Sequence, residues 1–228
     1  MGFRLPAIGL VAALTAPAAM AQEGLSNLPS IGKPTAGAMG FQEAATELAR
    51  DLQWLDGFIN VIIFGIVLLV TGLLAWVAIR YNEKSNPKPA EFTHNSPLEV
   101  AWTIVPILIL VFIGAFSLPI LFKQQEIPEA DITIKATGYQ WFWGYEYVDE
   151  GFGFDAFMLQ RDELAEAGYA DDEFLLATDQ AMVVPVGKTI VVQVTAADVI
   201  HSWTIPAFGV KQDRSEEHTS ELQSLSHI

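Results

Sequence analysis

The sequence of 228 residues contains no cysteine. It cannot form a disulfide bond from its own residues or supply a thiolate ligand to a metal ion. Positive charge is also scarce, because 12 Lys and Arg stand against 27 Asp and Glu, for a formal net charge of −15. A nucleic-acid partner requires a basic surface. This balance therefore excludes nucleic acid and favours either a cationic partner or simple solubility.

Charge is also missing from two long stretches, residues 58–79 and 100–122. About 22 residues at about 1.5 Å each span roughly 30 Å, which is the thickness of a bilayer core. Pro106 and Pro119 lie inside the second stretch, and proline is tolerated in membrane helices where neighbours satisfy the freed backbone groups. We predict two transmembrane helices, since buried core helices of this length are unusual.

The first residues have the features of a secretory signal. Arg4 precedes an apolar run, and Ala19-Met20-Ala21 is a small-residue cleavage site. A first transmembrane helix is the alternative, but the run is short and lies between Pro6 and Pro17. We therefore expect a signal peptide that directs the N-terminus out of the cytoplasm.

The loop between the two apolar runs begins after Arg80 and carries Lys84 and Lys88. The positive-inside rule places this loop in the cytoplasm and both flanks outside, in agreement with the signal peptide. The predicted order is a signal peptide (1–21), an exported N-terminal segment (22–56), a transmembrane helix (57–80), a cytoplasmic loop (81–97), a second transmembrane helix (98–122), an exported domain (123–213) and a tail (214–228).

The exported part is acidic and has strand-like patterns. Residues 122–228 hold 19 of the 27 carboxylates and 6 of the 12 Lys and Arg. "DITIKAT" alternates apolar and polar residues, and "MVVPVGKTIVVQVTAADVIHSWTIPAFGV" is rich in β-branched residues with a Pro-Val-Gly turn. Residues 161–180 are polar and predict a loop or a short helix. We expect a small sandwich or barrel of short strands.

The stretch "GYQWFWGYEY", residues 138–147, is the densest aromatic segment of the chain. If it is one strand, every second ring shares one face; these rings are Tyr139, Trp141, Trp143, Tyr145 and Tyr147. A sandwich core is the ordinary explanation for such a row. Five large rings exceed what a small core takes from one strand, and the excess would suit contact with another protein or the membrane interface.

The sequence leaves open the roles of two isolated residues. Glu99 lies at the cytoplasmic end of the second apolar run, where it is either an interfacial carboxylate or an entry group for protons. His201, in "DVIHSW", begins an apolar strand-like segment. It is either a structural histidine or a metal ligand, since imidazole binds copper and zinc.

Four motifs occur in the order and spacing of one family: "PLEVAWTIVP", "GYQWFWGYEY", "PVGKTI" and "DVIHSWTIPAFGVKQD". With the predicted topology, residues 40–213 resemble subunit II of a bacterial, alphaproteobacterial-type aa3-like cytochrome c oxidase. The resemblance implies an α+β membrane protein. A two-helix transmembrane hairpin would be followed by an exported cupredoxin-like antiparallel β-sandwich on the periplasmic side of the bacterial inner membrane.

The resemblance also implies roles for individual residues. Trp141 would receive electrons from cytochrome c, and Glu99 would open a proton path into the haem-copper subunit I. His201 would be the first ligand of a dinuclear copper centre that relays electrons to that subunit, coupled to proton translocation. A lysine-rich cytochrome would dock on the carboxylates at the matching positions, which are Glu146, Asp179 and Asp198.

The resemblance ends after Asp213. The family continues with further β-structure and a loop that carries two cysteines, a histidine and a methionine, which complete the copper site. Here residues 214–228 read "RSEEHTSELQSLSHI", which is polar, lacks strand periodicity and resembles translated adapter read-through. We expect a non-native tail and an incomplete sandwich with an open, aggregation-prone sheet edge.

The copper centre is affected most by this departure, because soft sulfur ligands stabilise the copper pair. His218 and His227 in the tail cannot replace two bridging thiolates, although they could hold a single copper or zinc ion weakly. We therefore expect residues 1–228 to bind no dinuclear copper. Two alternatives stay open: subunit II of a quinol oxidase, which lacks this copper centre, and a non-catalytic membrane-anchored β-module.

Overall fold

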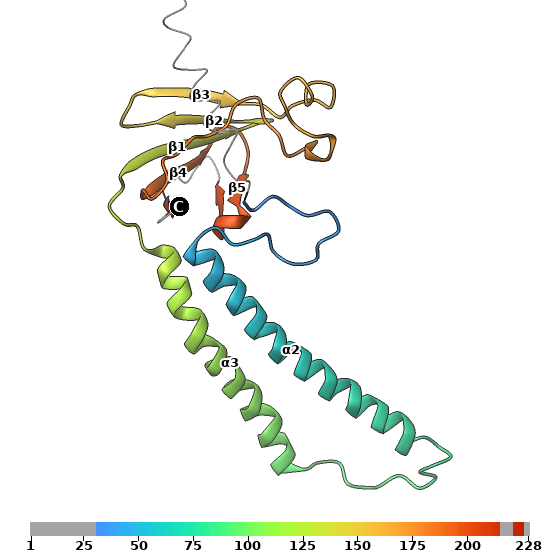
Figure 1. Ribbon diagram of the computed structural model, residues 1–228. Coiled ribbons are helices and arrows are strands. Elements are labelled where there is room, and N and C mark those ends of the chain that lie inside the picture. The colour runs from blue at the N-terminus through green and yellow to red at the C-terminus, as the bar shows by residue number, and fades with distance from the viewer. Residues whose placement is uncertain (1–30, 215–220, 226–228) are drawn as a thin grey trace, which may run out of the picture.

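Two long helices carry a β-domain at one end (Figure 1). The computed structural model describes residues 31–214 and 221–225, and its elements are labelled as in Figure 1. Helix α2 spans Glu47–Arg80 and helix α3 spans Ser96–Gln125. Both helices are long and apolar enough to cross a membrane. The predicted signal peptide, His218 and His227 lie outside the described residues.

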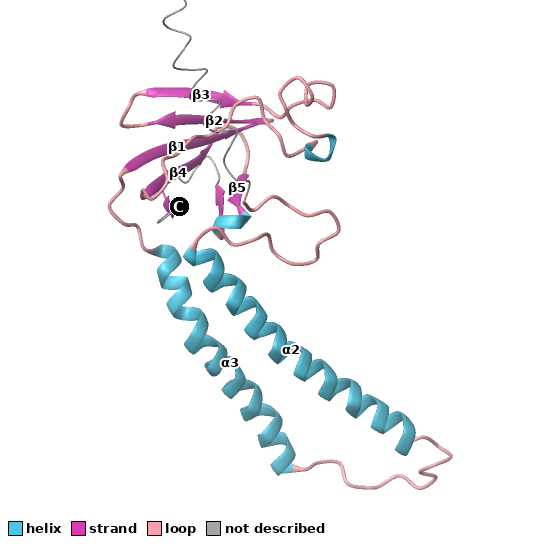
Figure 2. Cartoon of the chain, viewed as in Figure 1, coloured by secondary structure: helices cyan, strands magenta, loops and turns pink. Residues whose placement is uncertain are grey.

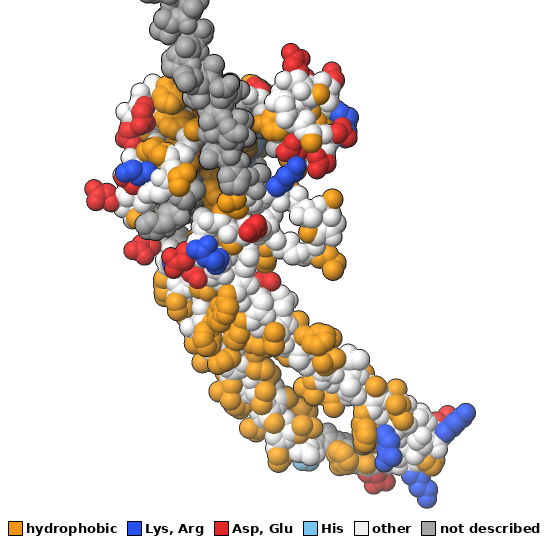
Figure 3. Space-filling view, viewed as in Figure 1, with side chains coloured by type: hydrophobic (Ala, Val, Ile, Leu, Met, Phe, Trp, Pro, Cys, Tyr) orange, Lys and Arg blue, Asp and Glu red, His pale blue; other side chains and the backbone are white. Residues whose placement is uncertain are grey.

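Helix α2 begins ten residues before the predicted span, because residues 47–56 and the apolar run form one continuous helix. The Thr46 hydroxyl accepts a hydrogen bond from Ala49 N (3.1 Å), which satisfies one of the free amides at the helix start. In the space-filling view, apolar side chains cover the helices, and basic side chains gather at the end remote from the β-domain (Figure 3). This distribution agrees with the predicted orientation of the hairpin.

The two helices meet near the β-domain. Four rings pack between them with centroids 5.1–5.9 Å apart, namely Trp54, Phe58, Phe112 and Phe116. Lys123 of α3 forms ion pairs with Glu47 (3.1 Å) and Asp51 (2.6 Å) of α2. These contacts join the end of α3, from which the chain enters the β-domain, to the start of α2.

The β-domain contains two sheets (Figure 2). One has the strand order β3-β2-β1-β4-β7 and the other is the hairpin β5-β6. The strands are β1 (Ile132–Tyr139), β2 (Phe142–Tyr147), β3 (Phe152–Ala156), β4 (Ile190–Ala196), β5 (His201–Ile205), β6 (Val210–Arg214) and β7 (Glu221–Leu225). Strand β1 runs parallel to β4, whereas the other strand pairs are antiparallel. The sandwich is therefore mixed rather than wholly antiparallel, because a long crossover between β3 and β4 allows parallel pairing.

The main core lies between the two sheets. Its buried members come from five strands: Ile134, Ala136, Tyr147, Ile190, Val192, Val194, Trp203 and Val210. A smaller cluster joins Leu159 to Leu164 and Ala177 of the polar segment 161–180, which was predicted as a loop or short helix. That segment consists of turns and one 3₁₀ turn, η1 (Asp171–Glu173), so the prediction is confirmed.

The expectation for the tail is wrong in one respect. Residues Glu221–Leu225 form strand β7, which pairs antiparallel with β4 from Ile190↔Leu225 to Val194↔Glu221. A strand was not expected here, because the tail lacks strand periodicity, but a polar sequence can still complete a backbone ladder. That the tail is non-native stays a prediction.

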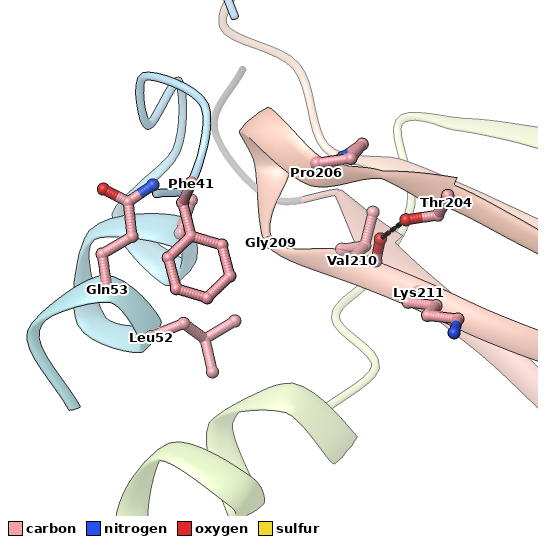
Figure 4. Close-up of a pocket in the computed structure, with 9 residues that line it drawn as sticks. Phe41, Leu52, Gln53, Thr204, Pro206, Gly209, Val210 and Lys211 are labelled. Atoms are coloured by element: carbon pink, nitrogen blue, oxygen red, sulfur yellow. Dashed lines mark hydrogen bonds between the residues drawn. The ribbon is translucent and has the colours of Figure 1, made fainter. Parts of the chain in front are cut away.

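The β5–β6 hairpin rests on the start of α2. It turns through a 3₁₀ turn, η2 (Pro206–Phe208), whose Phe208 carbonyl accepts a hydrogen bond from the Thr46 hydroxyl (2.7 Å). Gly209 has φ +73°, and a Cβ there would lie 2.8 Å from Ala49 Cα, so this position requires glycine. Beside this contact lies an apolar groove between the hairpin and the segment that carries Phe41 and Leu52 (Figure 4).

Candidate functional site

The predicted aromatic strand is in fact a hairpin. Strand β1 ends at Tyr139 and β2 begins at Phe142, so Gln140 and Trp141 form the two-residue connection. The Gln140–Trp141 peptide bond is cis. Trp141 is 86% exposed, which places a large indole ring on the surface of the β-domain. The sequence lacks the Asn-Gly or Asp-Gly signal typical of such turns, and the turn was therefore missed.

The turn divides the rings between two faces of the sheet. Trp143, Tyr145 and Tyr147 follow at every second position of β2 and pack against the core. Tyr139 and Phe142, which are cross-strand partners, stack on the opposite face with centroids 4.6 Å apart. The expectation that all five rings share one face is wrong, because the turn between Tyr139 and Phe142 ends the alternation.

His201 is the first residue of β5 and packs against β1. Its side chain is 15% exposed, and its ring meets the Trp143 ring edge-on at 5.8 Å. A Cβ on Gly138 would lie 2.6 Å from His201 Cγ. The absence of a side chain at position 138 thus makes room for the imidazole, which approaches the β1 backbone closely.

Asp198 links His201 to the Trp141 turn. Its Oδ1 accepts hydrogen bonds from His201 Nε2 (2.6 Å) and Val199 N (2.6 Å), while its Oδ2 accepts one from Gln140 N (2.7 Å). The hydrogen bond from His201, and those from the two backbone amides, lower the pKa of Asp198 below its ordinary value. The carboxylate is therefore ionised at neutral pH.

The two other predicted docking carboxylates occupy different places. Asp179 Oδ1 accepts a hydrogen bond from Phe157 N (2.7 Å), and the Phe157 ring stacks on Phe142, next to Trp141. Glu146 projects from the outer face of β2, opposite Lys135 of β1 and Gly153 of β3. At about 3.3 Å per residue it lies roughly 16 Å along the chain from Trp141.

Sequence reasoning missed a further carboxylate on this outer face. Asp155 pairs with Gly144 in the β2–β3 register, and a Cβ on Gly144 would lie 3.1 Å from Asp155 Oδ1. Together with Glu146 and Tyr139 it lines a shallow groove on the sheet. A single acid in "FGFDAF" carries no local signal, so only the strand pairing reveals its position.

Two tyrosines anchor the inner side of β2. The Tyr147 hydroxyl donates to Val183 O (2.6 Å) and accepts from Val183 N (2.9 Å). The Tyr145 hydroxyl accepts from Trp203 Nε1 (3.3 Å). Burial raises the pKa of both phenols above the ordinary value. These bonds hold the strand that follows Trp141 against the core.

Glu99 lies far from this group. It belongs to the first turn of α3, where its Oε1 accepts a hydrogen bond from Asn95 N (3.2 Å), and Asn95 Oδ1 accepts one from Leu98 N (3.3 Å). The distance along the helix axis from Glu99 to the end of α3 is roughly 40 Å, at about 1.5 Å per residue. The structure thus brings Trp141, Asp198 and His201 together and leaves Glu99 at the opposite end of the hairpin (Figure 1).

Comparison with known proteins decides the family. The family model described as the transmembrane domain of cytochrome C oxidase subunit II matches residues 34–120, and the model of its periplasmic domain matches residues 132–225. Cytochrome c oxidase subunit 2 of Cereibacter sphaeroides is 59% identical over 221 residues, covering 91% of this chain and 72% of that protein. The chain belongs to the cytochrome c oxidase subunit II family.

Two further sequence relatives agree with this assignment. A probable cytochrome c oxidase subunit 2 of Rickettsia bellii is 42% identical and covers 79% of this chain; this chain spans 66% of that protein. The chain spans 54% of the Rickettsia felis protein, which is also 42% identical. Among solved structures, the periplasmic domain of subunit II of cytochrome oxidase of Bradyrhizobium japonicum is 45% identical, with a TM-score of 0.38, covering 45% of this chain and 67% of that chain.

Membership of the subunit II family confirms several predictions. The chain is a subunit of an oxidoreductase complex, with a transmembrane hairpin and a periplasmic β-sandwich in the bacterial inner membrane. These relatives are of the alphaproteobacterial type, as the motif resemblance predicted.

The family implies a copper centre, which the residues present do not fit. Residues 1–228 contain no cysteine. Among residues 31–214 and 221–225, no group of three His, Cys, Asp or Glu side chains is placed to hold a metal ion. His201, which the sequence predicts as the first copper ligand, has its Nε2 engaged by Asp198. A thiolate-bridged copper pair would need ligands from outside this sequence.

Proposed function

We propose that this chain is the electron-entry subunit of its oxidase, with Trp141 as the residue that receives electrons from cytochrome c. The observation that carries the proposal is the exposed position of Trp141 on a turn whose backbone is bonded to Asp198. A partner's redox group can approach such a ring directly.

A short path leads from the ring to His201. It runs along the backbone from Trp141 to Gln140, across the hydrogen bond to Asp198 Oδ2 (2.7 Å), and from Asp198 Oδ1 to His201 Nε2 (2.6 Å). His201 matches the family's first copper-ligating histidine by position. The proposal ends at this imidazole, because the donor set of residues 1–228 does not fit the dinuclear copper centre.

The acidic charge of the chain supports a cytochrome as the electron donor. The chain has a net charge of −15, and acidic side chains are prominent on the β-domain in the space-filling view (Figure 3). We propose that Glu146, Asp179 and Asp198 contribute to the docking of a lysine-rich cytochrome c. Opposite charges accelerate encounter and make it sensitive to ionic strength.

The opposite end of the hairpin supports a second role. We propose that the haem-copper subunit I packs against the exposed apolar sides of α2 and α3, and that Glu99 lies at the mouth of a proton path into that subunit. A carboxylate at the cytoplasmic end of a membrane helix is a functional candidate by default. Its hydrogen bond to Asn95 N fixes the side chain at this end of α3.

The decisive experiment compares Trp141→Phe with Trp54→Phe in an oxidase that is assembled with this chain and supplied with the thiolate copper ligands that residues 1–228 lack. We expect Trp141→Phe to lower the rate of cytochrome c oxidation at saturating donor by at least about tenfold, equivalent to about 1.4 kcal/mol in the barrier. The Kd for cytochrome c should change little. Trp54→Phe, a matched change of a ring that packs at the helix junction and not in the β-domain, should leave the rate unchanged.

Other outcomes separate the alternatives. An assembled complex that oxidises quinol but not cytochrome c would support the quinol-oxidase reading. If the complex oxidises cytochrome c equally well with and without this chain, the electron-entry role is wrong. The non-catalytic membrane-anchored module would then be the better description.

A further inference from the structure

A loop without charged residues precedes helix α2. Residues 34–42 read "PTAGAMGFQ" and lie between Lys33 and Glu43. The large apolar side chains of this loop are not buried, since Met39 is fully exposed and Phe41 is 63% exposed. Apolar side chains grouped on an exposed surface mark a contact with another protein or with a membrane. The height of the loop beside α2 decides between these two.

Both ends of the loop are held by the β-domain. Lys33 forms ion pairs with Asp172 (3.6 Å) and Glu173 (3.3 Å), and Ala45 N donates a hydrogen bond to Ala207 O (2.8 Å). Between these points the loop reaches outward beside the start of α2, and its visible face carries apolar and uncharged side chains (Figures 1 and 3). The β-domain therefore presents this loop at a defined place.

A hydrogen bond sets the height of the loop along α2. Gln53 Nε2 donates to the backbone carbonyl of Gln42 (2.8 Å), so the end of the loop lies beside Gln53. The uncharged part of α2 begins at Phe58, which is about 7.5 Å further along the helix axis. The headgroup region of a bilayer is roughly 5–8 Å thick on each side of the hydrocarbon core. Residues 39–42 therefore lie at the level of the headgroups of the periplasmic leaflet.

Side chains of α2 at the same height agree with this placement. Trp54 is 54% exposed, and tryptophan is enriched at the interface between membrane and water. Leu52 lies beside the Phe41 ring in the apolar groove (Figure 4). The loop and α2 thus share one apolar surface at the level of the headgroups.

We propose that residues 34–42 form an interfacial membrane contact, in which Met39 and Phe41 enter the boundary between the headgroups and the acyl chains of the periplasmic leaflet. Apolar side chains gain free energy by leaving water at this depth, and the absence of charge avoids the cost of removing an ion from water. Because Ala45 and Thr46 are bonded to the 3₁₀ turn η2, this contact gives the β-domain a further attachment to the bilayer besides the two helices. The inference goes beyond the electron-entry role and is independent of it.

Nitroxide labels on the full chain in lipid nanodiscs measure the depth of the loop. Residues 1–228 contain no cysteine, so each introduced cysteine carries a single label. The test positions are Met39→Cys and Phe41→Cys. Leu68→Cys, about halfway along the uncharged run of α2, is the reference for the hydrocarbon core. Val148→Cys is the matched reference for water, because it is an exposed apolar residue between β2 and β3.

The measurement compares the collision of each label with oxygen, which concentrates in the bilayer, and with a neutral nickel complex, which stays in water. The oxygen-to-nickel ratio at positions 39 and 41 should exceed that of Val148→Cys by about threefold or more, because side chains at the headgroup level are partly withdrawn from water. It should stay below the ratio of Leu68→Cys. Ratios at both test positions equal to that of Val148→Cys would overturn the inference.

Cross-linking in the assembled oxidase identifies what touches the loop there. A photoreactive benzophenone amino acid at position 39 reacts with the C–H groups that lie against it. Cross-links to phospholipid would support the membrane contact. Cross-links confined to another oxidase subunit would assign this face to a protein partner and overturn the inference, even if the loop of the isolated chain reaches the lipid.

Discussion

The imidazole of His201 lies directly over the backbone of Gly138. A Cβ at position 138 would be 2.6 Å from His201 Cγ and 2.8 Å from His201 Cβ. The backbone at Gly138 cannot shift away from the ring, because Gly138 pairs with Trp143 of β2 on one side and with Ala196 of β4 on the other. The close approach of the β1 backbone to the imidazole of β5 thus fixes the position of His201.

Gly138→Ala should therefore displace His201. Because the ladder holds position 138 from both sides, we expect the ring to move and the free energy of unfolding to fall by about 1–3 kcal/mol, as for other overpacked sites. Chemical denaturation followed by tryptophan fluorescence measures the loss, and histidine ¹⁵N shifts report the displacement. Gly57→Ala in α2, where nothing lies within 4 Å of the added methyl, should not destabilise the chain. A His201 signal that is unchanged in Gly138→Ala would contradict this prediction.

Tyr147→Phe should weaken the domain without altering the Trp141 turn. It removes both hydrogen bonds to the Val183 backbone and leaves that N–H and C=O without their partner, at a cost of about 1–3 kcal/mol. Thermal unfolding of the purified chain would measure this loss. Tyr139→Phe is the comparison, since the hydroxyl of Tyr139 makes no hydrogen bond among the described residues. Equal stability of the two variants would show that the Val183 bonds contribute nothing.

Stability should decline in alkaline solution. Burial raises the pKa of Tyr145 and Tyr147 in the folded chain. The unfolded chain then loses these protons first, near the ordinary value of about 10. The contribution of the two phenols to the free energy of unfolding is complete below that pH. It falls as the pH rises toward their pKa in the folded chain. Unfolding free energies measured from about pH 8 to 11 should show this slope, and the double variant Tyr145→Phe/Tyr147→Phe should flatten it. A slope that persists in the double variant must come from other groups.

Lys123→Ala should loosen the junction of the two helices only slightly. Its ion pairs with Glu47 and Asp51 are partly exposed, and such pairs contribute about 0.2–1 kcal/mol. A double-mutant cycle with Asp51→Asn would isolate the coupling, which should shrink as salt is added. A coupling that does not depend on salt would point to packing of the lysine stem rather than to charge.

Single residues show where sequence-based prediction succeeded and where it failed. The ends of α3 agree with the predicted span to within three residues, because hydropathy is a local property. For α2, hydropathy located the apolar run but not the helix start at Glu47, where Thr46 caps an amphipathic extension. The aromatic segment was read as a single strand, because "YQWF" carries no glycine or asparagine to mark its turn.

The candidate site was predicted as separate residues rather than as an arrangement. Motif resemblance singled out Trp141, Asp198 and His201, but it assigned Asp198 to docking alone. Its bond to Gln140 joins residues 58 positions apart, and no local pattern encodes such a pair. Asp155 was missed for the same reason, since its place beside Gly144 depends on the β2–β3 register.

The amino-acid sequence by itself determined the two membrane spans, their orientation and the β-character of the exported domain, because hydropathy, charge bias and residue periodicity act over a few neighbouring residues. It also determined that no thiolate is present. Only the tertiary structure decided that β1 pairs parallel with β4, that Gly138 makes room for His201, and that Asp198 connects that ring to the Trp141 turn. These contacts form when distant segments close on one another and share a core.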